Sequence, residues 1–197
     1  MRCVACLAAA LALAAPALAE PPKDGARLGD APAAKDAPPH DLNFLFDALK
    51  AAPTPEAAKS VEESIWRLWL QSGSSTVDLL MTWAVEAAAA QDPDLALRYL
   101  DTLVELKPDY AEGWNKRATI HFRKHDYARA MADLQRVLVL EPRHFAAWNG
   151  LGIILQDIGE KKRALEAFRK ALAIDPHLEA ARKAVEALGP EVEGQEL

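Results

Sequence analysis

The chain has 197 residues, of which 51% are hydrophobic and 26% are charged, and its formal net charge is −6. This size and composition suffice for one sizeable helical core and exclude a disordered chain. The acidic balance argues against nucleic acid as a partner, because phosphate binding needs a basic surface. The two cysteines are Cys3 and Cys6, so the rest of the chain excludes disulfide scaffolds, cysteine-ligated zinc and thiol nucleophiles.

The N-terminus carries the three-part pattern of a secretory signal peptide. Arg2 precedes an unbroken apolar run over residues 3–15, and Ala17 and Ala19 are the small residues that a signal peptidase reads. The sequence therefore predicts a signal peptide over residues 1–19, cleaved after Ala19, and export to the periplasm of a Gram-negative bacterium. The run is short for a membrane span, so we expect no stable membrane insertion after cleavage. The alternative is an uncleaved membrane anchor.

The next segments change from a proline-rich stretch to helical patterns. Residues 20–41 contain many prolines, alanines and alternating charges, which predicts a flexible linker because little apolar area can be buried. With Asp41 as the expected N-cap, apolar residues then recur at helical spacing, and Pro53 and Pro55 divide residues 42–73 into two helices. We expect this pair to be a degenerate cap on the N-terminal end of the helices that follow. No segment has the two-residue alternation of a strand.

The most informative feature is a period of 34 residues. Pro108, Pro142 and Pro176 are spaced at this period, each after an apolar helical segment, and Trp114 and Trp148 repeat the same spacing. Each proline ends a helix, because the residue before a proline is disfavoured in the α region. Alignment on the prolines gives three units, which cover residues 77–110, 111–144 and 145–178.

This pattern resembles the tetratricopeptide repeat (TPR) family, whose unit is a hairpin of two helices, A and B. The residues of the second and third units that match the family's structural positions are Trp114, Ala118, Ala130, Pro142, Trp148, Gly152, Ala164, Phe168 and Pro176. Small residues let the two helices approach closely, and large residues fill the remaining space. The resemblance implies an all-α fold, a right-handed solenoid of three helical hairpins with extra helices at both ends.

The ends of the helices also have sequence signals. Asp92, Asp126 and Glu160 stand at the turn inside each unit, where we expect an acidic residue to cap or complement helix B. Residues 179–197 begin with an apolar stripe at helical spacing, which predicts a C-terminal capping helix that Pro190 stops. An acidic, frayed tail is expected after it.

The resemblance further implies a concave groove lined by the A helices. The residues that map onto its ligand-facing positions in the second and third units are Asn115, Lys116, Thr119, Phe122, Arg123, Asn149, Ile153 and Gln156. Asn115 and Asn149 would offer amide donors and acceptors to a peptide backbone. Lys116 and Arg123 would bind an acidic side chain or a terminal carboxylate. The alternative is a solvated charged face without a defined ligand, and the five-residue carboxylate clamp of some family members is not reproduced.

No constellation of residues points to catalysis, a cofactor or a metal, so we expect a non-enzymatic protein. His121 and His125 are four residues apart on one expected helix, a spacing that allows two imidazoles to share a metal, but a third ligand is lacking. We interpret them as one packed and one solvated histidine. The tryptophans are interpreted as core residues at positions Trp66, Trp69, Trp83, Trp114 and Trp148.

Arg117 stands where the family usually has leucine. Because an unpaired guanidinium is costly to bury, we expect a partly buried ion pair with Asp133 or Glu141. The alternative is an exposed arginine that belongs to the ligand surface.

Together these patterns predict a scaffold or adaptor of the cell envelope that binds another protein or a peptide. This functional step rests on the family resemblance. The alternative is a self-assembling structural envelope protein, because short stacks expose apolar end faces. A homo-oligomer is therefore compatible with the sequence.

Overall fold

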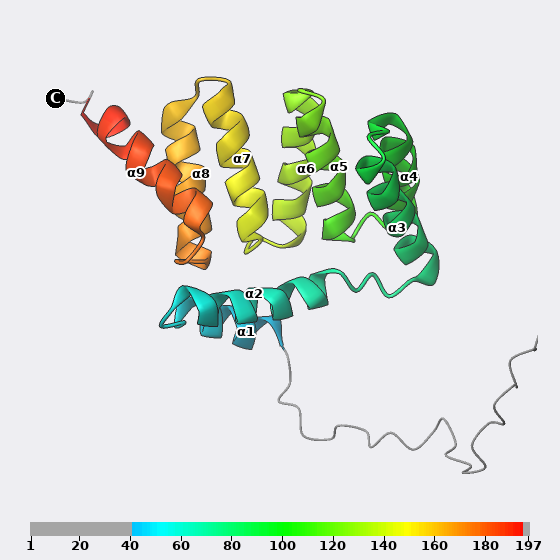
Figure 1. The fold of residues 1–197 in the computed structure, drawn as a ribbon, viewed down its shortest axis with the longest axis horizontal. Coiled ribbons are helices and arrows are strands. Elements are labelled where there is room, and N and C mark those ends of the chain that lie inside the picture. Colours follow the sequence, from blue (N-terminus) through cyan, green and yellow to red (C-terminus); the bar gives the residue numbers. More distant parts are fainter. Residues whose placement is uncertain (1–40, 195–197) are drawn as a thin grey trace, which may run out of the picture. The chain divides into compact units, whose positions relative to one another are not determined.

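Residues 41–194, the part of the chain that the computed structural model describes, fold into helices and turns without a strand (Figure 1). In chain order the helices are α1 (Leu42–Lys50), α2 (Pro55–Trp69), α3 (Ser75–Ala89), α4 (Pro93–Leu106), α5 (Ala111–Arg123), α6 (Tyr127–Leu140), α7 (Phe145–Asp157), α8 (Lys161–Ile174) and α9 (Glu179–Glu193). The expected signal peptide and nearly all of the expected linker lie outside the described residues. Within residues 41–194, no helix is long and apolar enough to cross a membrane.

Three helical hairpins form the body of the fold, as the 34-residue period predicts. The A helices are α3, α5 and α7, and each packs on the B helix that follows it, α4, α6 and α8 respectively. Successive hairpins pack side by side through α4 with α5 and α6 with α7, and α9 covers α8 (Figure 1). The B helices end as expected: Lys107, Glu141 and Asp175 leave the α region, with ψ of 76°, 95° and 95°, directly before the three repeat prolines.

The acidic residues of the turns behave differently from one another. The Asp92 side chain accepts a hydrogen bond from the backbone N–H of Leu95 at 2.9 Å, and Asp126 accepts one from Arg129 at 3.2 Å. Glu160 makes no such bond. Direct capping is therefore confirmed for the first two repeats, and in the third the glutamate can only complement the helix dipole.

The turn that follows each A helix contains one residue in the left-handed region. These residues are Gln91, His125 and Gly159, each one repeat apart, with φ of 61°, 58° and 84°. Glycine adopts this conformation without strain, whereas a residue with a Cβ does so at a cost of roughly 1 kcal/mol. His125 is thus a turn residue, exposed to solvent as expected.

Close packing between helices depends on the small residues of the repeat pattern. Ala118, Ala130 and Ala164 are buried between helices. A Cβ atom built on Gly152 would lie 2.6 Å from Cε1 of the Phe168 ring, so only glycine fits there without a shift of the ring. These four small residues therefore have the packing role that the repeat pattern implies.

The tryptophans are only partly the core residues that we expected. Trp69 is buried, and Trp66, Trp114 and Trp148 are half-buried against three separate apolar clusters. Trp83, however, is 41% exposed. The interpretation of Trp83 as core is wrong, because no helix packs over the outer side of α3 in residues 41–194.

The helices α1 and α2 form a hairpin, but they do not cap the N-terminal end of the stack. Their apolar residues form a cluster with Phe145 at the start of α7, and Ile174 at the end of α8 and Leu178 before α9 pack against the same cluster. The hairpin therefore follows the junctions between repeats, across one edge of the stack (Figure 1). The physical reason is that large apolar side chains gather at these junctions and bury the face that carries Trp69.

Polar contacts fix the same placement of the hairpin. The Tyr110 hydroxyl, in the turn between α4 and α5, donates a hydrogen bond to the carbonyl of Leu70 at 3.2 Å. At the far end, Nε2 of His177 lies 2.9 Å from the carbonyl oxygen of Ala52. These bonds join the hairpin to the stack at both of its ends.

The C-terminal helix is longer than the sequence suggests. It continues through Gly189 and Pro190 as far as Glu193, so the expected stop at Pro190 is wrong. The proline removes one helical hydrogen bond, but Leu188 and Val192 are buried on either side of it. Glu191 and Glu193 also form ion pairs with side chains of α8, Lys161 and Arg169.

Candidate functional site

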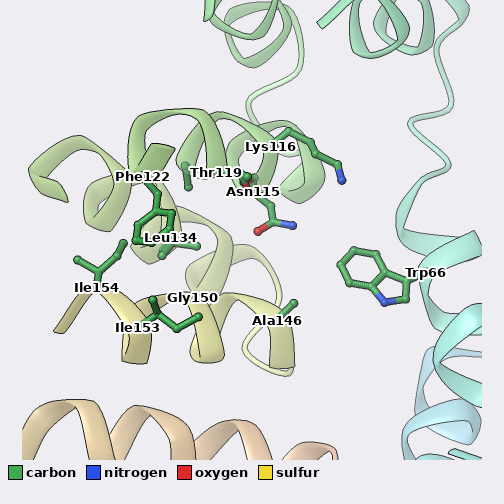
Figure 2. A pocket seen from close by; sticks show the side chains of 11 residues that line it. Trp66, Asn115, Lys116, Thr119, Phe122, Leu134, Ala146, Gly150, Ile153 and Ile154 are labelled. Atoms are coloured by element: carbon green, nitrogen blue, oxygen red, sulfur yellow. The ribbon is translucent and has the colours of Figure 1, made fainter. Parts of the chain in front are cut away.

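A cavity of about 280 Å³ lies on the face formed by the A helices of the second and third repeats (Figure 2). Its lining residues come from α5, α6, α7 and α2, and they are Trp66, Asn115, Lys116, Ala118, Thr119, Phe122, Leu134, Ala146, Gly150, Ile153 and Ile154. A second cavity of about 280 Å³ lies between α3 and α5, and Lys116 and Thr119 line both cavities. The two cavities therefore lie next to each other along the A helices, and together we call them the groove.

Most of the predicted groove residues meet in this groove. The residues that line the first cavity are Asn115, Lys116, Thr119, Phe122 and Ile153. Arg123 lines the second cavity. Asn149 and Gln156 line neither: Gln156 is exposed, and Oδ1 of Asn149 is buried without a hydrogen-bond partner. The structure thus brings the other six predicted residues together, whereas their role in ligand binding stays a prediction.

Trp66 is a wall of the groove that the repeat pattern does not predict. Its ring packs edge-on against Trp69, with centroids 5.2 Å apart, and against His144 at 5.7 Å. Figure 2 shows the ring facing Asn115 and Ala146. Because Trp66 lies outside the repeats, only the docking of α2 on the repeat junctions brings it to the groove.

A buried pair of polar residues connects this wall to the groove. His144 and Glu112 have fully buried side chains, and Nε2 of His144 lies 2.6 Å from Oε1 of Glu112. Nδ1 of His144 accepts a hydrogen bond from the backbone N–H of Ala147 at 3.0 Å, so Nε2 carries the proton and donates a hydrogen bond to the Glu112 carboxylate. The Trp69 ring stacks on the imidazole of His144, with the ring centroids 4.2 Å apart and an angle of 4° between the ring planes.

The same carboxylate orients an amide of the groove. Nδ2 of Asn115 donates to the two carboxylate oxygens of Glu112 at 3.3 Å and 3.2 Å. Its amide oxygen stays available as an acceptor beside the cavity. Asn115 is therefore positioned from beneath, through Glu112, by the residues that hold α2 in place.

The two cations of the groove have no ion-pair partner among the described residues. Lys116 and Arg123 both project from α5, whereas the neighbouring Lys124 pairs with Asp94 of the first repeat. The remaining surface of the first cavity is largely apolar and includes Phe122 and Ile153. The groove thus combines an apolar floor with a free amide oxygen and two uncompensated positive charges.

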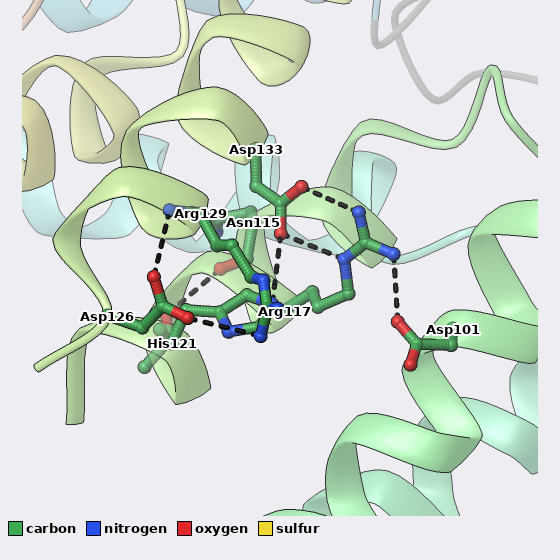
Figure 3. A network of polar contacts seen from close by, with 8 residues as sticks. Asp101, Asn115, Arg117, His121, Asp126, Arg129 and Asp133 are labelled. Carbon is green, nitrogen blue, oxygen red and sulfur yellow. Dashed lines mark hydrogen bonds and ion pairs between the residues drawn. The ribbon is translucent and has the colours of Figure 1, made fainter. Parts of the chain in front are cut away.

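Arg117 lies away from the groove, in an ion-pair network between repeats (Figure 3). Its Nε and Nη2 atoms donate to both carboxylate oxygens of Asp133, at 2.8 Å and 2.7 Å, and Nη1 donates to Asp101 at 2.9 Å. These bonds raise the pKa of Arg117, with the Asp133 hydrogen bond as the main cause. Pairing with Asp133 is confirmed, and pairing with Glu141 is wrong, because that carboxylate pairs with Arg143 at 3.2 Å.

His121 is packed beside this network and does not meet His125 at a shared site. Its Nε2 atom lies 4.0 Å from Oδ2 of Asp133, and burial lowers the pKa of His121. His125 is exposed, and its ring lies 3.2 Å from the Tyr127 hydroxyl. No three His, Cys, Asp or Glu side chains within residues 41–194 are arranged to hold a metal ion.

Comparison with known sequences agrees with the observed repeats. Tetratricopeptide repeat profiles match residues 81–140 and 118–189. A TPR repeat-containing protein of Rhizobium etli is 39% identical over 161 residues, which cover 82% of this chain and 79% of that relative. The small glutamine-rich tetratricopeptide repeat-containing protein 2 of Saccharomyces cerevisiae is 28% identical over 137 residues, but the match spans only 39% of the yeast protein.

Solved structures with similar folds are also repeat domains. The first TPR domain of Spaghetti (RPAP3), bound to an HSP90 peptide, has a TM-score of 0.58 at 16% identity, and the match covers 61% of this chain and 95% of that one. The Sgt2 TPR domain of Aspergillus fumigatus has a TM-score of 0.57 at 20% identity, with 62% and 83% covered. At these identities the likeness concerns the fold. The repeats, their packing and the sequence relatives together show that this chain belongs to the tetratricopeptide repeat family.

Proposed function

We propose that this protein is a non-enzymatic scaffold that binds a peptide segment of another protein in the groove along α5 and α7. The observation that carries the proposal is the combination of an apolar cavity with the uncompensated charges of Lys116 and Arg123. Charges without a partner at the edge of an apolar cavity favour a ligand that supplies both a carboxylate and an apolar side chain. The ligand is therefore an extended acidic segment with at least one large apolar residue.

The structural neighbours support a peptide ligand in general terms. The Spaghetti TPR domain was solved with an HSP90 peptide, so the shared fold is compatible with peptide binding. The details must come from the residues of this chain, because the identity is 16%. Asn115 would accept a hydrogen bond from the peptide backbone, and Trp66 would confine the ligand on the side of α2.

We further propose that binding takes place in the periplasm. The apolar run and the small residues before position 20 support cleavage by a signal peptidase after Ala19. Mass spectrometry of the protein purified from an envelope fraction tests this step. The expected N-terminal residue is Glu20, and an intact Met1 on membrane-bound protein would contradict it.

The groove is tested with fluorescent decapeptides that differ only in charge and in one apolar residue. Peptides that contain both glutamate and leucine should bind, and Lys116→Glu or Arg123→Glu should weaken binding at least tenfold. Lys183→Glu is the matched control, because Lys183 lies on α9, where it pairs with Glu179. Equal loss in the control variant, or equal binding of neutral peptides, would contradict the groove as the site.

A further inference from the structure

The N-terminal end of the stack exposes an apolar surface made by α3 and α4. Leu79 and Trp83, one turn apart on α3, are 47% and 41% exposed, and Leu106 at the end of α4 is 59% exposed. The Trp83 ring lies 5.5 Å from the ring of Tyr99, which is half-buried on α4. On α4, Leu95, Tyr99 and Leu106 follow one another at helical spacing. We call these five residues the end face.

The second repeat shows what covers the equivalent surface elsewhere in the stack. The counterparts of the two α3 residues, 34 positions later, are Gly113 and Arg117. A Cβ atom built on Gly113 would lie 2.3 Å from Cδ2 of Leu103, and Arg117 donates a hydrogen bond to Asp101. Both partners belong to α4, so this surface of the second repeat is covered by helix B of the repeat before it.

The third repeat follows the same rule. Ala147, the counterpart of Leu79, is fully buried in a cluster with Leu134 and Val137 of α6. In the first repeat no B helix precedes α3, and the α1–α2 hairpin packs at the repeat junctions instead. The geometry of the stack therefore specifies the shape of the missing occupant, an amphipathic helix placed as a B helix is placed.

The charges around the end face specify the chemistry of this helix. Glu86 lies one turn after Trp83 and Glu105 directly precedes Leu106, and neither has an ion-pair partner in residues 41–194. Residues 77–110 contain seven acidic and two basic residues in total. An occupant with lysine or arginine beside its apolar ridge would compensate these charges, whereas a second copy of the same face would bring like charges together.

We propose that the end face docks a basic amphipathic helix of a partner protein, in the position that a preceding helix B would occupy. This surface is separate from the groove, so the protein has two docking surfaces. The apolar core of the first repeat would then be continued by the partner, as each repeat continues its neighbour.

Two helices of this chain provide a matched pair of probes. A peptide with the sequence of α8, residues 161–174, has five basic residues and one acidic residue, whereas a peptide with the sequence of α4, residues 93–106, has one basic and three acidic residues. Both are B helices with apolar ridges, and both need a side-chain staple because isolated helices of this length are marginal in water. Fluorescence anisotropy with the full chain should show at least tenfold tighter binding of the α8 peptide.

Substitutions locate the binding to the end face. Trp83→Glu should weaken binding of the α8 peptide at least tenfold. Glu86→Lys should weaken this binding several-fold while leaving the apolar surface intact. Val139→Glu is the control, because Val139 is an exposed apolar residue on α6, outside the end face. Circular dichroism confirms that each variant is folded.

Several results would overturn the proposal. Equal affinity for the two peptides would show that charge does not select the occupant, and equal loss with Val139→Glu would place binding elsewhere. Binding that is insensitive to Trp83→Glu would indicate exchange with the protein's own α8. A dimer in analytical ultracentrifugation that Trp83→Glu dissociates would make a second copy the occupant.

Discussion

Replacing the ion pair between Arg117 and Asp133 by the residues found one repeat later tests how the second repeat is stabilised. Those residues are Leu151 and Ala167. The Asp133 side chain is 6% exposed and accepts two hydrogen bonds from Arg117. Arg117→Leu would leave this carboxylate buried without a guanidinium, which should lower the free energy of unfolding by about 3–5 kcal/mol.

The reverse single substitution should be milder. In Asp133→Ala, Arg117 keeps its bond to Asp101, and its side chain is 18% exposed and can reach water. We expect a loss of about 1–3 kcal/mol. The double variant removes both charges and copies the apolar pair of the third repeat, so its stability should lie within about 2 kcal/mol of the parent protein. The coupling energy of the cycle should then be at least about 2 kcal/mol.

Urea denaturation followed by circular dichroism at constant pH measures all four proteins. Circular dichroism is preferable to tryptophan fluorescence here, because the guanidinium of Arg117 lies 4.7 Å from the Trp114 ring. A double variant that loses the sum of the two single losses would refute the reasoning. If peptide binding also fell in Arg117→Leu alone, the arginine would belong to the ligand surface.

Four other substitutions follow from the packing and are measured by thermal or urea denaturation. Gly152→Ala should lower the free energy of unfolding by about 1–3 kcal/mol, because the added Cβ would clash with the Phe168 ring. Gly150→Ala on the same helix has room for the Cβ and should raise the free energy of unfolding by up to about 1 kcal/mol. Equal effects of the two substitutions would contradict the packing argument. Because burial lowers the pKa of His121, the unfolded chain binds a proton at this residue more readily than the folded chain does. The stability contributed by the neutral His121 is therefore present above about pH 6.5 and is lost as the pH falls. His121→Leu should therefore flatten the loss of stability between pH 7 and pH 5, and an unchanged pH profile would exclude this residue as its source. Trp148→Ala should lower the free energy of unfolding by about 3 kcal/mol, since its half-buried ring packs on the apolar cluster formed by α7, α8 and α9. An unchanged midpoint would contradict this structural role.

The repeat architecture could be predicted from the sequence because its signals are local. The prolines at a 34-residue period, the small residues and the capping aspartates act on neighbours within one turn or one hairpin. The partner of Arg117 within its own hairpin, Asp133, was predictable for the same reason. Its second partner, Asp101, belongs to the preceding repeat, and no pattern within one unit indicates it.

The groove shows the same division. Asn115 and Lys116 were predictable, since each occupies a fixed position on helix A of a known unit. Trp66 was not, because its place depends on where a hairpin outside the repeats docks, and two amphipathic helices can bury their apolar faces equally well against an end or an edge of the stack.

Only the tertiary structure decided these contacts. The α1–α2 hairpin lies at the repeat junctions because large apolar residues such as Phe145 are gathered there by segments distant in the chain. The last turn of α9 likewise continues beyond Pro190 because Val192 gains burial against the stack. Local propensity is a matter of about 1 kcal/mol or less for most residues, whereas burial of one large apolar side chain contributes about 1.5–3 kcal/mol. Contacts between distant segments therefore prevail wherever the two disagree.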